Sequence, residues 1–317
     1  MSNTEPTTDH TWTVTDEEGG HRLERVLARR LPELSRSQLR GLFAAGRVRL
    51  AGKVAAKGAL VAPGQVFALA ATAEELQPGA RPDPTVPVVL LLETPVLLVV
   101  DKPAGLPCAP LRPGETGTLA SGLLARYPEL AGIGWSPREP GLVNRLDTDT
   151  SGLLLVARTP AAFTQLRGLL QEGGLRKDYL LLCDSVDLPD SGLIDVPLAP
   201  HPKDRRKVVA CPLSRDRDRY GARPALTRYR VLRRSGELAL VEAEASAATR
   251  HQVRAHFAFL GHPLAGDPLY GGPALPGLTR QALHASRLAW GGGEGLPAFD
   301  VTSTLPEELA RFVGPAV

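Results

Sequence analysis

The first apolar pattern along the chain has the spacing of a helix. Between residues 21 and 34, apolar positions recur every three or four residues with arginines between them, which predicts an amphipathic helix with a cationic outer face. A second helix is expected over residues 36–45, because Ser35 is a residue type that caps helix starts. The pattern then changes to short extended runs, which predict a strand pair over 47–54 and a last strand over 65–70.

These elements divide the chain into parts. Residues 21–72 are predicted to form a small α/β module, and the polar, acidic residues 1–20 a flexible tail without the apolar stretch of a signal peptide. Residues 73–87 hold four prolines and are predicted to be a linker. A second domain is then expected over residues 88–317. It is predicted to open with two apolar strands, residues 88–92 and 96–100.

A polar turn between two apolar runs is the strongest local candidate for chemistry. Residues 153–156 are predicted to form a buried strand, and Asp147 would lie at the end of a rigid element with its side chain free. Asp, Thr, Ser and Gly are also what an ordinary strand connection uses, and composition alone favours that interpretation. A calcium loop over the same residues would need a glutamate at its twelfth position, which is Arg158, so calcium is not expected.

Composition is that of a globular protein. The chain has 317 residues, of which 43% are hydrophobic and 22% charged, which excludes a disordered or fibrous protein and suggests about two domains. The most apolar region, residues 86–100, is interrupted by polar residues and is too short to cross a membrane. Three separated cysteines without a C-x-x-C pair fit a reducing cytoplasm and offer no zinc site.

Positive charge is concentrated in two zones. The net charge is only +3, but residues 21–53 carry an excess of +7 and residues 201–234 an excess of +9, which leaves −13 for the rest. Coding bias could explain the preference for arginine over lysine but not this clustering. Two basic zones on an otherwise acidic protein predict a polyanionic partner, most simply nucleic acid.

The N-terminal module resembles the small RNA-binding module shared by a small-subunit ribosomal protein and the tyrosyl-tRNA synthetases. The residues that carry the resemblance are Arg22-Leu23, Leu27, residues 35–38, Gly46-Arg47-Val48 and residues 63–65. The resemblance implies that exposed arginines of the module bind RNA, and the candidates are Arg22, Arg36, Arg40 and Arg47. A basic helix pair that is simply solvated is the alternative.

Separated segments of the second domain match one family in order. They are residues 98–107 (LVVDKPAGLP), 145–156 (RLDTDTSGLLLV), 177–179 (KDY), 251–256 (HQVRAH), 261–271 (GHPLAGDPLYG) and 283–288 (LHASRL). Together with the module they resemble the ribosomal large-subunit pseudouridine synthase family. The resemblance implies an α+β fold, in which the catalytic domain has a mixed, mainly antiparallel central sheet.

The resemblance also implies a reaction. In RNA, a uridine would be isomerised to pseudouridine: its N1–C1′ bond is broken and a C5–C1′ bond is made, after the base has been flipped into the site. The catalytic aspartate falls on Asp147, which could attack the sugar or the base or assist elimination to a glycal. Arg254 would keep that carboxylate ionised, and Tyr179 would pack against the target base. The residues implied to bind substrate are Arg145, Lys102, Lys177 and His251.

Two segments depart from the family pattern. Asn144 stands where the family usually has histidine, and residues 247–250 read Ala-Ala-Thr-Arg where the family carries Thr-Gly-Arg and one further residue. A non-catalytic RNA-binding or ribosome-assembly protein on the same scaffold is therefore the alternative, and a metal-dependent nuclease using Asp147 and Asp149 is a third hypothesis. No metal is expected, because the spacings of His251, His256 and His262 do not place them on one helical face and no carboxylate accompanies them. No cofactor is expected, because the isomerisation is redox-neutral and adds no group. The expected partner is RNA, ribosomal or else transfer RNA, bound by a cytoplasmic monomer.

Overall fold

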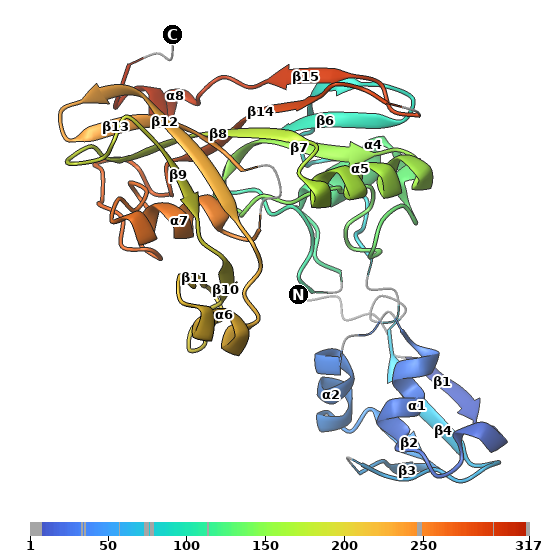
Figure 1. The fold of residues 1–317 in the computed structure, drawn as a ribbon. Helices are drawn as coiled ribbons and strands as arrows, with labels where there is room; N and C mark the ends of the chain where they lie inside the picture. Colours follow the sequence, from blue (N-terminus) through green and yellow to red (C-terminus); the bar gives the residue numbers. More distant parts are fainter. Residues whose placement is uncertain are drawn as a thin grey trace. The chain divides into compact units, whose positions relative to one another are not determined.

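The computed structural model describes residues 8–314 except 33, 35, 57, 73–75, 77–78, 113, 246–248 and 294, and of residue 37 only the backbone. Contacts divide it into two compact units, residues 1–81 with 110–116 and residues 82–109 with 117–317. The predicted helix cap Ser35 lies outside the described residues. Figure 1 shows the helices and strands of each unit.

The first unit is a four-stranded antiparallel sheet with two helices. In spatial order its strands are β1 (Thr8–Thr13), β4 (Val66–Ala71), β2 (Val48–Leu50) and β3 (Lys53–Val54). The helices are α1 (Leu23–Arg30) and α2 (Arg36–Ala44), and a short 3-10 helix, η1 (Asp16–Glu18), precedes them. The two helices, the hairpin and β4 confirm the predicted elements. The apolar stripe of α1 packs in the core with Phe67 and Leu69 of β4, as amphipathic spacing requires.

The predicted tail is wrong for residues 8–20. Residues 8–13 form β1, which pairs with β4 along its whole length, and η1 follows it. Glu18 then accepts two hydrogen bonds from Arg30, whose guanidinium lowers the pKa of that carboxyl to about 2. The strand is polar in every residue except Trp12, so its local pattern gives no sign of a partner more than fifty residues away.

The second unit is built on a nine-stranded sheet. Its order is β5 (Val89–Glu93), β6 (Leu97–Lys102), β7 (Ser151–Ala157), β14 (Leu283–Trp290), β8 (Arg176–Asp184), β13 (Leu238–Glu244), β12 (Leu226–Ser235) and β9 (Ser191–Asp195), and β15 (Phe299–Thr302) pairs with β14. The β7–β14 pair is parallel and the other pairs are antiparallel. This confirms the expected mixed, mainly antiparallel sheet.

Helices cover both faces of this sheet. The helices of this unit are α4 (Leu119–Arg126), η2 (Pro128–Leu130), α5 (Pro160–Glu172), α6 (Ser214–Tyr220), α7 (Gln252–Leu260) and α8 (Glu307–Ala310). A small hairpin, which α6 contacts, is formed by β10 (Leu198–Pro200) and β11 (Val208–Ala210). Figure 1 shows α7 on one side of the sheet and α8 on the other. Leu181 of β8 packs with Phe257 of α7, whereas its neighbour Leu180 packs with Leu309 of α8. Burial on both faces explains why β8 is apolar in a continuous run.

The boundary between the units differs from the predicted linker. Residues 82–87 belong to the second unit, where the Asp83 carboxylate accepts a hydrogen bond from the backbone N–H of Gly117 at 3.0 Å. Val86 packs so closely on Gly122 that a β-carbon there would lie 2.9 Å from it. The prolines at this end therefore shape a packed segment and do not merely space two domains.

Gly152 brings β7 and β14 together in parallel. It pairs with Ala285, and a β-carbon on it would lie 2.2 Å from the Ala285 carbonyl oxygen. Its φ of +110° is also one that only glycine adopts readily. Glycine at this position therefore permits the close approach of two parallel strands.

We expect Gly152→Ala to lower the free energy of unfolding by about 3 kcal/mol or more, because the strands must separate to admit the methyl group. Urea unfolding measures this. The matched control is Gly168→Ala in α5, where nothing lies within 4 Å of the added carbon. Helix propensity predicts a gain of about 0.5–1 kcal/mol for the control. Equal stability of the two variants would contradict the close-approach argument.

Candidate active site

Asp147 lies in a tight turn that leads into β7. The backbone N–H of Thr150 donates to the Asp147 carbonyl at 3.0 Å, which closes the turn. The Asp147 side chain is 25% exposed, so its carboxylate is reachable from solvent but not fully hydrated. Asp149, two residues later, is exposed, and its backbone carbonyl accepts from Arg280 at 3.1 Å. The two carboxylates of the turn therefore lie in different environments.

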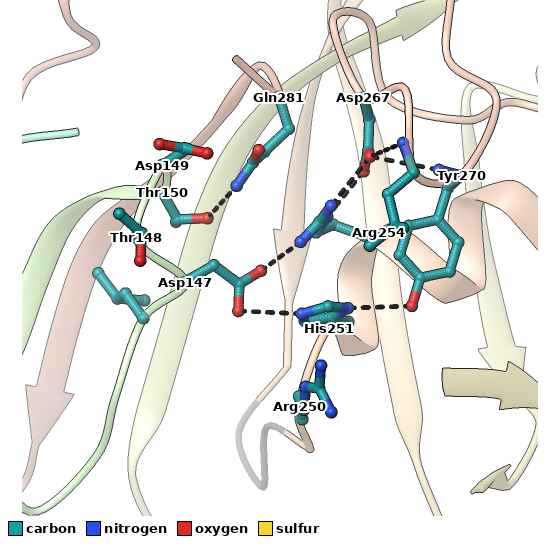
Figure 2. Close-up of polar contacts among 12 residues, drawn as sticks. Asp147, Thr148, Asp149, Thr150, Arg250, His251, Arg254, Asp267, Tyr270 and Gln281 are labelled. Carbon is teal, nitrogen blue, oxygen red and sulfur yellow. Dashed lines mark hydrogen bonds and ion pairs between the residues drawn. The ribbon is translucent and has the colours of Figure 1, made fainter. Parts of the chain in front are cut away.

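Arg254 in the first turn of α7 reaches the Asp147 carboxylate. Its Nη1 donates to Oδ2 of Asp147 at 2.7 Å (Figure 2). The other edge of the guanidinium donates to both oxygens of Asp267, Nε to Oδ2 at 2.7 Å and Nη2 to Oδ1 at 2.9 Å. Asp267 is fully buried and also accepts from the backbone N–H groups of Leu269 and Tyr270. The expected contact between Arg254 and Asp147 is therefore present, and Asp267 fixes it.

The electrostatics of this bridge favour its charged form. Burial alone would lower the pKa of Arg254, but the hydrogen bonds and charges of Asp267 and Asp147 outweigh it and raise that pKa. A bidentate arginine–carboxylate pair is also the strongest geometry for such a contact. One guanidinium thus bridges a buried carboxylate and a second, partly exposed one.

His251 contacts the other oxygen of Asp147. Its Nε2 lies 3.4 Å from Oδ1 of Asp147, and its Nδ1 lies 3.1 Å from the hydroxyl of Tyr270 (Figure 2). Burial lowers the pKa of His251 to about 4, although the charge of Asp147 acts in the opposite direction. The ring is therefore neutral at pH 7. It occupies the residue before α7 with a φ of +55°, a conformation uncommon outside glycine.

Lys102 holds the backbone of the turn that contains Asp147. It is fully buried, and its Nζ donates to the carbonyl oxygens of Pro103, Leu106 and Thr148 at 2.8–2.9 Å. Burial lowers the pKa of Lys102 to about 8, so the ammonium form persists at pH 7. Three carbonyl acceptors match its three N–H donors. The expectation that Lys102 binds substrate does not fit this burial, because it holds the backbone of the Asp147 turn instead.

Tyr179 and Lys177 lie on the face of β8 that is covered by α7. Both are buried, and the Lys177 ammonium lies 5.6 Å from the centre of the Tyr179 ring. Leu146, the residue before Asp147, packs against the same apolar cluster as Tyr179. The structure thus places these two predicted site residues on the same side of the sheet as Arg254. Among the described residues, no hydrogen bond joins either side chain to Asp147.

Arg145 does not contact Asp147. Its side chain is 64% exposed, and it forms an ion pair with Glu139 at 2.7 Å. The neighbouring Asn144 is buried: its Oδ1 accepts from the backbone N–H of Leu155, and its Nδ2 has no partner among the described residues. Among the described residues, Arg254 and not Arg145 therefore binds the Asp147 carboxylate. Arg145 remains available on the surface for a phosphate.

The altered segment before His251 is partly outside the described residues, which resume at Thr249. The Thr249 backbone N–H donates to the Gln252 side chain at 2.9 Å, which orders the start of α7. Arg250 turns away and donates to the backbone carbonyls of Arg205 and Arg206, at 3.1 and 2.7 Å. The arginine of this segment is thus bound to the loop of the β10–β11 hairpin.

Asp267 and Tyr270 lie in the matching segment of residues 261–271, but the sequence did not predict a role for either residue. The available signal was an acidic residue between glycine, proline and apolar residues, where a lone charge has to be paired if it is buried. His256, considered there beside His251, bonds to Thr227 and to the Val196 carbonyl and lies away from Asp147. Within the described part of the chain, no group of three metal-binding side chains gathers. No helix among the same residues is long and apolar enough to span a membrane.

Solved structures show a similar fold. Human RNA pseudouridylate synthase domain containing 1 matches with a TM-score of 0.55 and 23% identity, covering 74% of this chain and 91% of that one. Human RNA pseudouridylate synthase domain containing 4 matches with a TM-score of 0.54 and 24% identity, covering 70% and 90%. At these identities the likeness shows the fold of the second unit's sheet and helices, and no more.

Sequence relatives extend the match to activity. A family model described as RNA pseudouridylate synthase matches residues 96–259. An uncharacterised RNA pseudouridine synthase of Synechocystis is 37% identical over 276 residues, covering 85% of this chain and 81% of that protein. Ribosomal large subunit pseudouridine synthase D of Xanthomonas campestris is 35% identical over 316 residues, covering 95% and 90%. The chain therefore belongs to the RNA pseudouridylate synthase family and is an isomerase of uridine in RNA.

Proposed function

We propose that this enzyme converts one or more uridines of large-subunit ribosomal RNA to pseudouridine, with Asp147 as the reacting carboxylate. Curated relatives that cover most of the chain are ribosomal large subunit pseudouridine synthases, including that of Neisseria meningitidis at 34% identity. The observation that carries the role of Asp147 is its ion pair with Arg254, itself held by buried Asp267. The proposal places the reaction in the cytoplasm, where bacterial ribosomes assemble.

The geometry distinguishes the two oxygens of Asp147. Oδ2 is bound by Arg254 at 2.7 Å, whereas Oδ1 is 3.4 Å from His251, too far for a strong hydrogen bond. Oδ1 therefore keeps a lone pair for the substrate. Attack at C1′, attack at the base and assisted elimination to a glycal all use an ionised carboxylate in this way. Each route ends with the C5 hydrogen of uridine released and a hydrogen gained at N1.

Substrate has to approach as an extruded base, because the glycosidic bond inside a stacked helix is out of reach. We assign Tyr179 to packing against that base, with Lys177 beside its ring at 5.6 Å. Exposed Arg145 would bind a neighbouring phosphate. The basic loop of residues 201–207, between β10 and β11, offers Lys203, Arg205, Arg206 and Lys207 to the RNA backbone.

The N-terminal unit supplies a second set of cations. Arg22, Arg36 and Arg40 are exposed, and the proposal assigns them to RNA phosphates. Arg47 is half-buried and donates its Nε to the Ala70 carbonyl at 2.7 Å, so part of its bonding capacity stabilises the unit itself. Such contacts set affinity and register on the RNA and leave the chemistry to the second unit.

Asp147→Asn should abolish isomerisation. With a bacterial large-subunit ribosomal RNA transcript tritiated at C5 of uridine, we expect label release to fall by about a thousandfold or more, because the carboxylate takes part in the chemical step. Asp149→Asn is the matched control, since no hydrogen bond or ion pair among the described residues involves this exposed carboxylate two residues away, and it should retain activity within about twofold. Wild-type release from Asp147→Asn would refute its role, and RNA binding without release by the unaltered protein would favour the non-catalytic alternative.

Arg254 is expected to serve stability and chemistry separately. Arg254→Met leaves Asp267 buried without its cation and should lower the free energy of unfolding by about 3–5 kcal/mol. Adding Asp267→Asn removes that charge while its Oδ1 still accepts the two backbone N–H groups, so the double variant should regain most of the stability. Tritium release should stay low in both. Activity restored together with stability would show that Arg254 acts only through folding.

Arg36→Ser with Arg40→Ser tests the N-terminal unit. Loss of two phosphate contacts should weaken binding of the ribosomal RNA transcript and reduce the slope of log Kd against log salt by about 1.4–1.8. Single-turnover label release at saturating enzyme should be unchanged, because neither residue takes part in the reaction. The control is Arg126→Ser, an exposed arginine outside both basic zones. An equal loss of affinity in the control would indicate a general charge effect and not a binding site.

A further inference from the structure

The Tyr270 hydroxyl lies between the active site and the β10–β11 hairpin. It is 2.9 Å from the backbone N of Val208, 3.4 Å from the Val208 carbonyl oxygen and 3.1 Å from Nδ1 of His251. A hydroxyl has one hydrogen to donate, and its oxygen accepts. The backbone N–H of Val208 is a donor only, so it donates to the Tyr270 oxygen. The Tyr270 hydrogen then goes to the nearer acceptor, Nδ1 of His251.

This assignment determines which nitrogen of His251 carries hydrogen. A neutral imidazole has one N–H, and the nitrogen that accepts a hydrogen bond is the other one. If Nδ1 accepts from Tyr270, the hydrogen is on Nε2, which faces Oδ1 of Asp147 at 3.4 Å. The opposite tautomer would direct a nitrogen lone pair at a carboxylate oxygen. Both contacts therefore favour the Nε2–H form (Figure 2).

We propose that Tyr270 is a positioning residue that holds His251 in its Nε2–H tautomer, so that the ring presents a donor to the reacting carboxylate. The inference rests on the proposed role of Asp147. It assigns to His251 the task of orienting Oδ1 while leaving that oxygen a free lone pair. Tyr270 contacts no atom of Asp147 itself, and its effect passes through the imidazole.

Other contacts keep the Tyr270 ring in place. The Arg254 guanidinium lies 5.2 Å from the ring centre and the Lys207 ammonium 5.9 Å from it, which are cation–π distances. Burial raises the pKa of Tyr270, so the phenol retains the hydrogen that it donates. Charged groups around His251 are Asp147, Arg254, Arg250 and Asp267, and burial outweighs them in keeping the ring neutral.

The same tyrosine connects His251 to the basic loop. Val208 begins β11 directly after residues 201–207, and Arg250, next to His251, holds the backbone carbonyls of Arg205 and Arg206. The loop proposed to meet RNA phosphates is therefore held at its backbone by Arg250, and Val208, the residue after the loop, is linked to His251 through the Tyr270 hydroxyl. The Arg206 side chain of this loop is paired with Asp204 at 2.9 Å and the Lys207 ammonium lies over the Tyr270 ring, while the backbone of Val208 and the tautomer of His251 share one hydroxyl.

Tyr270→Phe tests the proposal, because it keeps the ring and its cation contacts and removes only the hydroxyl. We expect kcat for label release from the ribosomal RNA transcript to fall about tenfold with KM within about twofold. Two-bond ¹H–¹⁵N correlation spectra of His251, identified by the signals that His251→Gln removes, should show one Nε2–H tautomer in the unaltered protein and a mixture in Tyr270→Phe. The control is Tyr127→Phe, which loses a buried hydroxyl bonded to Glu93 at 2.9 Å and should change neither kcat nor the His251 signals.

The acid behaviour of His251 adds a second measurement. Its pKa of about 4 in the folded protein lies below the ordinary histidine value of 6.5, so between these values the unfolded chain binds the proton first and acidification favours unfolding. His251 should therefore still be neutral at pH 5.5. An Nδ1–H tautomer or an imidazolium at pH 7, or a Tyr270→Phe protein with unchanged tautomer and kcat, would overturn the proposal. Failure of the Asp147 assignment would appear separately, as label release by Asp147→Asn.

Discussion

The structure of the site depends on one buried guanidinium that joins three distant segments. Arg254 at the start of α7 binds Asp147, 107 residues earlier in the chain, and Asp267, 13 residues later. A buried charge is tolerated only when it is paired and hydrogen-bonded, so the helix, the turn and the following loop are held in one arrangement. Asp267 is the anchor of this bridge because it is fully buried and its two oxygens take up one edge of the guanidinium.

Lys102 is a second buried cation, and it holds a different part of the site than Arg254 does. Lys102 binds three backbone carbonyls and fixes the main chain of the turn, whereas Arg254 fixes the direction of the Asp147 side chain. Arginines on the surface, such as Arg36 and Arg145, make exposed contacts or make none that the fold requires. The chain thus uses buried cations to build the site and leaves other cations exposed, which is why the total charge says little about the chemistry.

Local pattern was sufficient for elements that carry their own periodicity, such as α1, α2 and the strands of residues 89–102. The contact between Asp147 and Arg254 came from family resemblance and is confirmed, although no local signal links residues so far apart. β1 was missed because its polar sequence is stabilised by pairing with β4. The three carbonyl contacts of Lys102 could not be predicted from local pattern, because burial, a property of the folded chain, decides whether a lysine meets substrate or backbone.

The charge balance around Asp147 explains why a neutral histidine suits this site. Two carboxylates and one guanidinium leave a net charge of −1, which resides on the exposed member, Asp147. An imidazolium at His251 would cancel that charge and hold Oδ1 through a charge-assisted hydrogen bond, which would reduce its reactivity. A neutral N–H at 3.4 Å orients the oxygen and leaves it free. The positive φ of His251 fits this account, because backbone strain persists where surrounding contacts hold a functional residue in place.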